Sequence, residues 1–307
     1  MGRLGLTLIT GPANAGKVAL LLRRYLDALD REPFLIVPIR SDVDRVERDL
    51  LAVRPALLGG TVGTFDDLFE RLAFGADDAR RVVSDVQRTL VIRRAINAFR
   101  SRLNGLGHSA RFSGFADALL QCVSELGAGL VDPVDLDGDL RELYAAYRAE
   151  LDRLGLWDRD LLRRYAAERL ASDLDAWDGA PVFLYGFEDL TGAEWALLQA
   201  LAGRAEVTVS IPYEPARTAF AALTDTIGDL ADLADGRVDE LPPRWSDVAA
   251  PAIAHVERAL FEDIPAPAPA IEGAVRFFEA AGARGASSPM FSARSWSAAR
   301  STPSARD

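Results

Sequence analysis

Lys17 is the residue of this sequence best suited to chemistry, and it is the only lysine in the chain. Every other basic residue among the 35 is an arginine. The glycines at positions 11 and 16 precede Lys17 with the G-x-x-x-x-G-K spacing of a phosphate-binding loop, in which Ser or Thr usually follows. A compact ammonium fits between nucleotide phosphates, where the planar guanidinium of arginine is too wide. We therefore predict a nucleotide-binding loop made of Gly11, Pro12, Ala13, Asn14, Ala15, Gly16, Lys17 and Val18.

The segments on either side of this loop have the patterns that a phosphate-binding site requires. Residues 4–10 form an apolar run that predicts a buried parallel strand, and residues 17–29 carry apolar residues at helical spacing. A strand, a glycine loop and a helix amino terminus together present backbone N–H groups and the positive end of the helix dipole to an anion. The alternative is a turn that contains one lysine by chance, and this order of elements argues against it.

Length and composition limit the classes of protein to which the chain can belong. Its 307 residues, 49% of them apolar, suffice for one large domain or two. No continuous run of about 20 apolar residues is present, so we expect no membrane span. The single cysteine, Cys122, excludes an internal disulfide and is typical of a reducing cytoplasm, where we expect the protein to be located. His108 and His255 are too isolated for a metal cluster, so we predict no metal site.

The net charge of −11 argues against a protein that binds nucleic acid on its own, because phosphate contacts require positive charge. It does not argue against DNA contacts inside an assembly whose other subunits supply a basic channel. Paired arginines such as Arg93-Arg94 and Arg163-Arg164 fall in helical segments, where we interpret them as solvent-facing.

The first part of the chain alternates predicted strands and helices. After the loop and its helix, residues 33–38 predict a strand, residues 42–53 a polar helix, and residues 60–68 a strand that turns into a helix. This alternation is typical of a parallel sheet with helical connections.

Residues 77–178 show helix patterns and no strand-like alternation. The helices predicted there cover residues 82–100, 111–128, 140–154 and 159–170. Strand patterns return at residues 181–185 and 205–211, on either side of a helix at 192–202. A helical segment thus interrupts the strand-containing part of the chain.

We therefore predict an α/β fold, a RecA-like P-loop parallel sheet with an inserted all-helical domain. The discontinuous core would comprise residues 1–76 and 179–262, and the insertion residues 77–178. We expect a Pro/Ala-rich linker and the start of a missing second core at 263–285, and a disordered serine-rich tail at 286–307.

The order and spacing of four segments resemble the amino-terminal region of superfamily 1 (UvrD-like) DNA helicases. The closer resemblance is to the AddB/RexB-like component of the bacterial ATP-dependent helicase/deoxyribonuclease that processes double-strand breaks, a PD-(D/E)XK nuclease family protein, and it covers residues 1–285. The matching segments are residues 11–17, 62–68, 143–147 with 156–162, and 182–189. The resemblance implies that the second of these segments, through Thr64 and Phe65, contacts single-stranded DNA.

The sequence departs from this family at the residues that would carry out hydrolysis. Working members place an Asp-Glu pair directly before a Phe in the second motif, and here Tyr185 and Gly186 precede Phe187. The Asp would help to hold magnesium, and the Glu would activate the attacking water. Val18 also replaces the magnesium-binding hydroxyl of the loop. We therefore expect ATP to bind with little dependence on magnesium and to be hydrolysed poorly.

The resemblance implies a function as a helicase-like scaffold in DNA break processing. The expected partners are an AddA-like helicase–nuclease protein and, within that complex, single- or double-stranded DNA. The second helicase core and the nuclease domain of the family lie beyond this chain, so we expect that the reading frame was lost or truncated near Gly285.

Three alternatives remain open at the level of sequence. The chain could be an active DNA-dependent ATPase or helicase domain in which Glu188 or Asp189 replaces the missing acids. It could be a structural protein whose loop is vestigial and binds nothing. It could also be a P-loop kinase of small molecules, although such kinases need a loop hydroxyl and seldom carry a helical insertion of this length.

Overall fold

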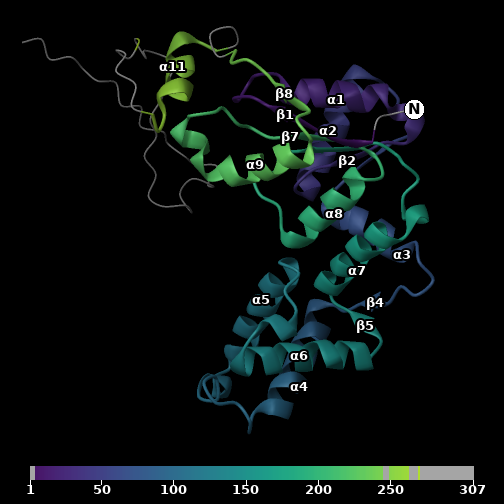
Figure 1. Ribbon diagram of the computed structural model, residues 1–307, viewed down its shortest axis with the longest axis vertical. Coiled ribbons are helices and arrows are strands. Elements are labelled where there is room, and N and C mark those ends of the chain that lie inside the picture. Colours follow the sequence, from purple (N-terminus) through teal and green to yellow (C-terminus); the bar gives the residue numbers. More distant parts are fainter. Residues whose placement is uncertain (1–3, 245–248, 263–268, 270–307) are drawn as a thin grey trace, which may run out of the picture.

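The computed structural model describes residues 4–244, 249–262 and 269 (Figure 1). Its central sheet has six strands in the order β3-β2-β6-β7-β1-β8, and every paired strand runs parallel to its neighbour. These strands are β1 (Gly5–Thr10), β2 (Phe34–Ile36), β3 (Thr61–Gly63), β6 (Val182–Tyr185), β7 (Glu206–Ser210) and β8 (Val238–Glu240). The predicted α/β fold with a parallel sheet is confirmed, and the assignment to the RecA-like class stays a prediction.

Helices cover both faces of the sheet, because successive strand residues point to opposite sides and both sides are apolar. Ile9, Leu35 and Phe183 pack with α1 and α2, whereas their strand neighbours pack with α3, α7, α8 and α9. The helices around the sheet are α1 (Lys17–Asp27), α2 (Arg40–Val53), α3 (Phe65–Phe74), α7 (Arg159–Ser172), α8 (Gly192–Ala202), α9 (Thr224–Leu233) and α11 (Pro251–Ala259). Short 3₁₀ helices lie at η1 (Leu29–Arg31), η4 (Leu174–Ala176) and η5 (Thr218–Leu223).

A second group of helices extends away from the sheet (Figure 1). It contains α4 (Asp85–Phe99), η2 (Ser109–Arg111), α5 (Phe115–Ala128), η3 (Pro133–Asp135) and α6 (Gly138–Arg153). Its own core includes Ile92, Val123, Leu143 and Tyr147. We predicted no strand in this region, and that prediction was wrong: β4 (Arg81–Val82) pairs in parallel with β5 (Leu156–Trp157). Strands of two residues are too short to show the alternation on which the prediction relied.

Helix α7 connects the two groups. Its residues Leu162, Ala166 and Leu170 lie in the same core as Leu68 and Leu72 of α3, beneath the sheet. The division of the chain into a discontinuous core and an insertion at 77–178 stays a prediction. The linker expected at 263–285 (except residue 269) and the tail expected at 286–307 lie outside the described residues. In the part of the chain that the structure describes, no helix has both the length and the apolar character needed to cross a lipid bilayer.

A network of buried charges holds α3, α4, α6 and α7 together. Asp158 caps α7 by accepting the N–H of Leu161 at 2.8 Å, and it also accepts the hydroxyl of Tyr147 at 2.7 Å. Asp160 lies 3.3 Å from a guanidinium nitrogen of Arg88 and 3.4 Å from one of Arg163. The network reaches α3 through Arg163, which pairs with Asp66 at 2.7 Å. Burial, with the neighbouring charge of Asp158, raises the pKa of Asp160 to about 6.

This raised pKa predicts a dependence of stability on pH. The Asp160 carboxyl has a pKa of about 6 in the folded chain and an ordinary value of 3.8, so the folded state favours its neutral form. As the pH rises from about 4 to about 6, this carboxyl ionises in the unfolded chain while it stays largely neutral in the folded chain. The free energy of unfolding therefore falls, by about 1.4 kcal/mol for each unit of difference between the two pKa values. Asp160→Asn, which stays neutral, is expected to gain stability relative to the native chain over that window. Urea unfolding at both ends of the window measures this, and a difference between the two proteins that does not change with pH would contradict it.

Candidate functional site

The predicted phosphate-binding loop lies between the end of β1 and the start of α1. Gly16 has φ 91° and is the residue before the helix, and no side chain in the described structure caps the first N–H groups of α1. The first turn of α1 also contains no acidic residue. The N–H groups and the positive end of the helix dipole therefore face the loop without an anionic side chain in that turn.

Gly11 is fixed at the base of the loop by contacts that only glycine permits. Its φ is 140°, and a Cβ atom there would lie 2.7 Å from the carbonyl oxygen of Leu241. Its carbonyl accepts the N–H of Tyr213 at 3.0 Å, and the N–H of Leu241 donates to Thr10 at 2.9 Å. The segments after β7 and β8 thus hold the loop in place, which local sequence patterns could not reveal.

Lys17 is buried, with 8% of its surface exposed, and its ammonium donates a hydrogen bond to the carbonyl of Pro12 within the loop. Burial lowers the pKa of Lys17, and the negative charge of Glu257 partly opposes this. Among the described residues, Lys17 forms no ion pair with a carboxylate. The loop therefore holds one buried positive charge that is hydrogen-bonded to a neutral carbonyl oxygen, an arrangement that an anion would stabilise.

Glu257 of α11 is a residue at this site that sequence reasoning missed. One of its carboxylate oxygens accepts the amide N–H of Asn14 at 3.4 Å, and the other is buried without a hydrogen-bond partner in the described structure. Arg217 donates to the backbone carbonyl of Glu257 at 2.7 Å and pairs with Glu214 at 3.1 Å, which holds α11 beside the loop. No local pattern could have revealed this contact, because Asn14 and Glu257 lie 243 positions apart.

Tyr185 lies at the end of β6, the position that the sequence resemblance pairs with the Asp of working helicases. In the sheet register Tyr185, Ser210 and Ile9 lie side by side, so Tyr185 is about 10 Å from β1. Its hydroxyl is hydrogen-bonded to Arg45, and burial raises the pKa of this phenol. Arg45 also pairs with Asp42 at 3.0 Å. Tyr185 is therefore a neutral group that is engaged with α2.

Gly186, which the sequence resemblance pairs with the Glu of working helicases, has a backbone conformation that disfavours any side chain. Its φ is 90°, and a Cβ atom would lie 3.2 Å from the Cγ and Cδ atoms of Pro38. A glutamate here would have to adopt left-handed backbone and displace Pro38. The backbone at this position therefore favours glycine over a glutamate.

The two acids proposed as replacements are exposed to solvent. Asp189 accepts the N–H of Leu190 at 2.8 Å, and the described structure shows no contact between Glu188 or Asp189 and the loop. The ring of Phe187 packs against Phe65 at a centroid distance of 5.1 Å, on the apolar side of the segment. A catalytic role for either acid stays a prediction that the observed contacts do not favour.

The two residues that would contact DNA have structural roles. Thr64 caps α3 in a reciprocal pair with Asp67, whose carboxylate accepts the N–H of Thr64 at 2.7 Å. Phe65 has only 4% of its surface exposed and packs against Phe69 as well as Phe187. A base could stack on Phe65 only after a rearrangement of this core, so its contact with DNA stays a prediction.

Magnesium does not fit the groups that surround the loop. Val18 offers no hydroxyl, Tyr185 is bound to Arg45, and Gly186 has no side chain. In the described ranges no group of three or more His, Cys, Asp or Glu residues is arranged to hold a metal ion. The remaining ligands for an anion are the loop N–H groups and Lys17, which fit the phosphates of a nucleotide without a metal.

The fold and the loop together define an α/β protein with a parallel sheet and a glycine loop between its first strand and first helix. Residues 8–237 match the family described as "ADDB, N-terminal". The chain therefore belongs to this family, and the resemblance seen in the sequence is confirmed.

Curated relatives are named as the B subunit of an ATP-dependent helicase/deoxyribonuclease. The protein from Desulforamulus reducens is 26% identical over 302 residues, which cover 84% of this chain and 26% of that protein. The protein from Desulforudis audaxviator is 29% identical over 298 residues, covering 84% of this chain and 25% of the relative. The protein from Pelotomaculum thermopropionicum is 30% identical over 237 residues, covering 68% of this chain and 20% of the relative. The chain thus spans about a quarter of the length of the first two relatives.

The geometry at Gly186 predicts a stability effect. Gly186→Ala is expected to lower the free energy of unfolding by about 1–3 kcal/mol, because alanine at φ 90° is strained and its Cβ meets Pro38. Gly228→Ala is the matched control, since Gly228 lies in α9 and a Cβ there meets nothing within 4 Å. That control is expected to raise stability by up to about 1 kcal/mol. If both changes alter the free energy of unfolding equally in urea, Gly186 is not the strained position described here.

Proposed function

We propose that this chain is the nucleotide-binding, hydrolysis-poor scaffold region of a helicase–nuclease component that acts in DNA double-strand-break processing. In this proposal the parallel sheet is a RecA-like core, and the loop at residues 11–18 binds ATP. The observation that carries the proposal is the buried Lys17 ammonium inside a glycine loop at a helix amino terminus. Such a loop stabilises phosphate oxygens through N–H groups, the helix dipole and one ammonium.

Poor hydrolysis is the second part of the proposal. Phosphoryl transfer needs a metal that neutralises the developing charge and a group that positions the attacking water. At Val18, Tyr185 and Gly186 the side chains supply neither, and the surroundings of Tyr185 and Gly186 are adapted to the residues present. The nucleotide would therefore stabilise the fold and the relative position of α11 instead of driving movement.

The partners follow from the family. The curated relatives are named as subunits of a helicase/deoxyribonuclease, which implies a further component for those proteins. We propose that this chain likewise acts beside an AddA-like partner, on single- or double-stranded DNA held in the complex, and in the cytoplasm. The proposed partner would supply the hydrolysis that this site lacks.

A structural role with a vestigial loop is a second candidate, and the position of Glu257 favours it. Its carboxylate carries the negative charge that interacts with Lys17 in this structure, and it bonds to Asn14 of the loop. If this contact is permanent, α11 takes the place of a ligand. If it is replaced on binding, α11 is the segment that reports the presence of nucleotide.

Substitution of Lys17 separates these two candidate functions. The native chain is expected to bind a fluorescent ATP analogue with similar affinity with and without magnesium. Lys17→Ala is expected to weaken binding about tenfold or more, because a charge-assisted contact is lost. Fluorescence titration measures both, and equal affinity of the native chain and Lys17→Ala would favour the vestigial loop.

A second prediction concerns Glu257. A phosphate in the loop would be repelled by this carboxylate, so Glu257→Gln is expected to strengthen binding of the analogue about fivefold, as expected for roughly 1 kcal/mol of repulsion in water. Glu70→Gln, on exposed α3 surface, removes the same charge and is expected to change nothing. Weaker binding by Glu257→Gln would instead show that the carboxylate supports the ligand, directly or through a cation.

A further inference from the structure

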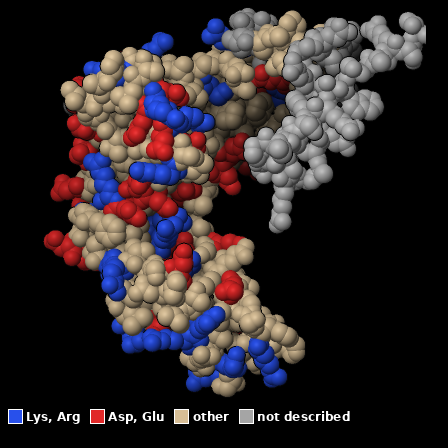
Figure 2. Space-filling view, turned by 180° about the vertical axis from the view of Figure 1, so that it is seen from behind, with Lys and Arg blue, Asp and Glu red and all other residues tan. Residues whose placement is uncertain are grey.

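The distribution of charge along this acidic chain is uneven. Residues 86–116 contain six arginines and no aspartate or glutamate, although the whole chain has a net charge of −11. This segment comprises most of α4, the loop that follows it, and the start of α5. Figure 2 shows basic side chains gathered at the end of the helical group that lies farthest from the sheet. We call residues 93–116 the tip.

Four arginines of the tip are exposed and lack acidic partners. Arg93, Arg100, Arg102 and Arg111 form no ion pair with a carboxylate in the described part of the chain. Arg94 differs, because it pairs with Glu150 at 3.1 Å. Paired arginines stabilise a surface, whereas a group of unpaired ones is repulsive and is favourable only toward an anion.

Three of these arginines line one hollow of about 360 Å³. The polar and aromatic residues of its wall are Arg93, Asn97, Arg100, Arg111, Phe112, Ser113 and Phe115. Arg100 donates to the carbonyl of Ala110 at 3.0 Å, which links the end of α4 to the 3₁₀ helix η2 across the hollow's wall. No acidic residue lines it.

Phe112 stands at the edge of this hollow with 64% of its surface exposed. Its ring packs edge-on against His108 at a centroid distance of 5.5 Å, which orients the ring and leaves much of it open to solvent. An exposed phenylalanine ring costs free energy, which a ligand that covers the ring would recover. A nucleobase can stack on such a ring while its phosphates contact the guanidinium groups of the neighbouring hollow.

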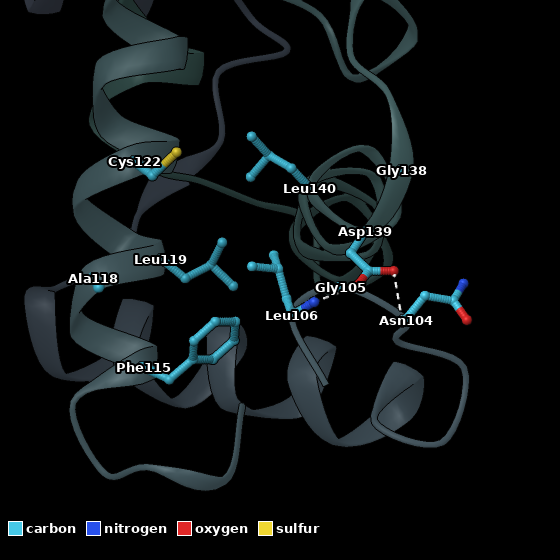
Figure 3. Close-up of a pocket in the computed structure, with 10 residues that line it drawn as sticks. All are labelled: Asn104, Gly105, Leu106, Phe115, Ala118, Leu119, Cys122, Gly138, Asp139 and Leu140. Atoms are coloured by element: carbon cyan, nitrogen blue, oxygen red, sulfur yellow. Dashed lines mark hydrogen bonds between the residues drawn. The ribbon is translucent and has the colours of Figure 1, made fainter. Parts of the chain in front are cut away.

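A second, apolar hollow of about 720 Å³ lies beside the tip (Figure 3). Asp139 at its edge accepts the N–H of Asn104 at 3.1 Å and of Leu106 at 2.7 Å, and these bonds lower the pKa of its carboxyl. Its negative charge is therefore used to fix the loop and does not neutralise the arginines. Phe115 lies in the walls of both hollows and joins them.

We infer that the tip is a binding surface for single-stranded DNA, in which arginines contact phosphates and Phe112 stacks on a base. The choice of DNA rests on the proposed function, whereas the surface itself is separate from the nucleotide loop. Single strands combine exposed phosphates with unstacked bases, which matches arginines beside an open aromatic ring. Charge at the tip acts locally, because the acidic charges elsewhere are screened beyond about 8–10 Å at ordinary salt.

The test is binding of a fluorescein-labelled oligothymidylate to the full chain, followed by anisotropy at several salt concentrations. Arg93→Gln/Arg111→Gln is expected to weaken binding about tenfold or more and to reduce the salt slope by about 0.7 per lost phosphate contact. Phe112→Ala is expected to weaken it about fivefold or more, and Phe112→Trp to retain it. Arg23→Gln/Arg48→Gln, with the same change of net charge on exposed positions of α1 and α2, is the matched control.

The outcomes decide between this surface and others. Losses confined to the tip variants, with binding of the ATP analogue unchanged, support the inference and leave the nucleotide proposal to its own test. Absence of binding by the native chain, or equal losses in the tip and control pairs, overturns it. Oligonucleotide binding that is intact in the tip variants also overturns it.

Discussion

Burying an ammonium costs free energy unless oxygen acceptors or an anion lie beside it. In this chain the Lys17 ammonium is buried at the first turn of α1. The Pro12 carbonyl is its acceptor, and the negative charge of Glu257 partly offsets the effect of burial on its pKa. The other features of the site follow from this constraint. The loop closes over the ammonium, Gly11 permits the approach of Leu241, and α11 brings its carboxylate to Asn14. Any ligand of the loop must compete with, or use, these arrangements.

The parallel sheet brings the loop and the altered strand end to the same edge, because the carboxyl ends of parallel strands point in one direction. In the proposed function, the loop at that edge binds an anion, and the neighbouring strand end supplies neither a metal ligand nor a base. Both residues at the strand end have contacts of their own: Arg45 is hydrogen-bonded to the Tyr185 hydroxyl, and Pro38 packs against Gly186. Acids at these two positions would therefore disturb α2 and the strand end, which is consistent with the proposal that nucleotide is a structural ligand of this fold.

Local patterns predicted much of this molecule. The strands β1, β6 and β7 are short apolar runs buried on both faces, and the glycine spacing located the loop before α1. Strand β8 was not predicted, because Val238–Glu240 is an acidic segment that joins the sheet through backbone bonds to β1. Glu257 was missed because its contact joins distant parts of the chain. Arg93 and Arg94 were interpreted as solvent-facing, and both are exposed. The same interpretation was wrong for Arg163 and Arg164, which are half-buried and pair with carboxylates. Sequence alone does not show which carboxylates lie near an arginine.

The proposal that the loop binds nucleotide without hydrolysing it is tested most directly by steady-state ATP hydrolysis. The assay uses the full chain with magnesium and single-stranded DNA present. If the site has no metal anchor and no general base, as we propose, turnover is predicted to be at background and equal to that of Lys17→Ala. DNA-stimulated turnover of about one per second, the lower end of ordinary enzymes, that disappears in Lys17→Ala would contradict this assignment.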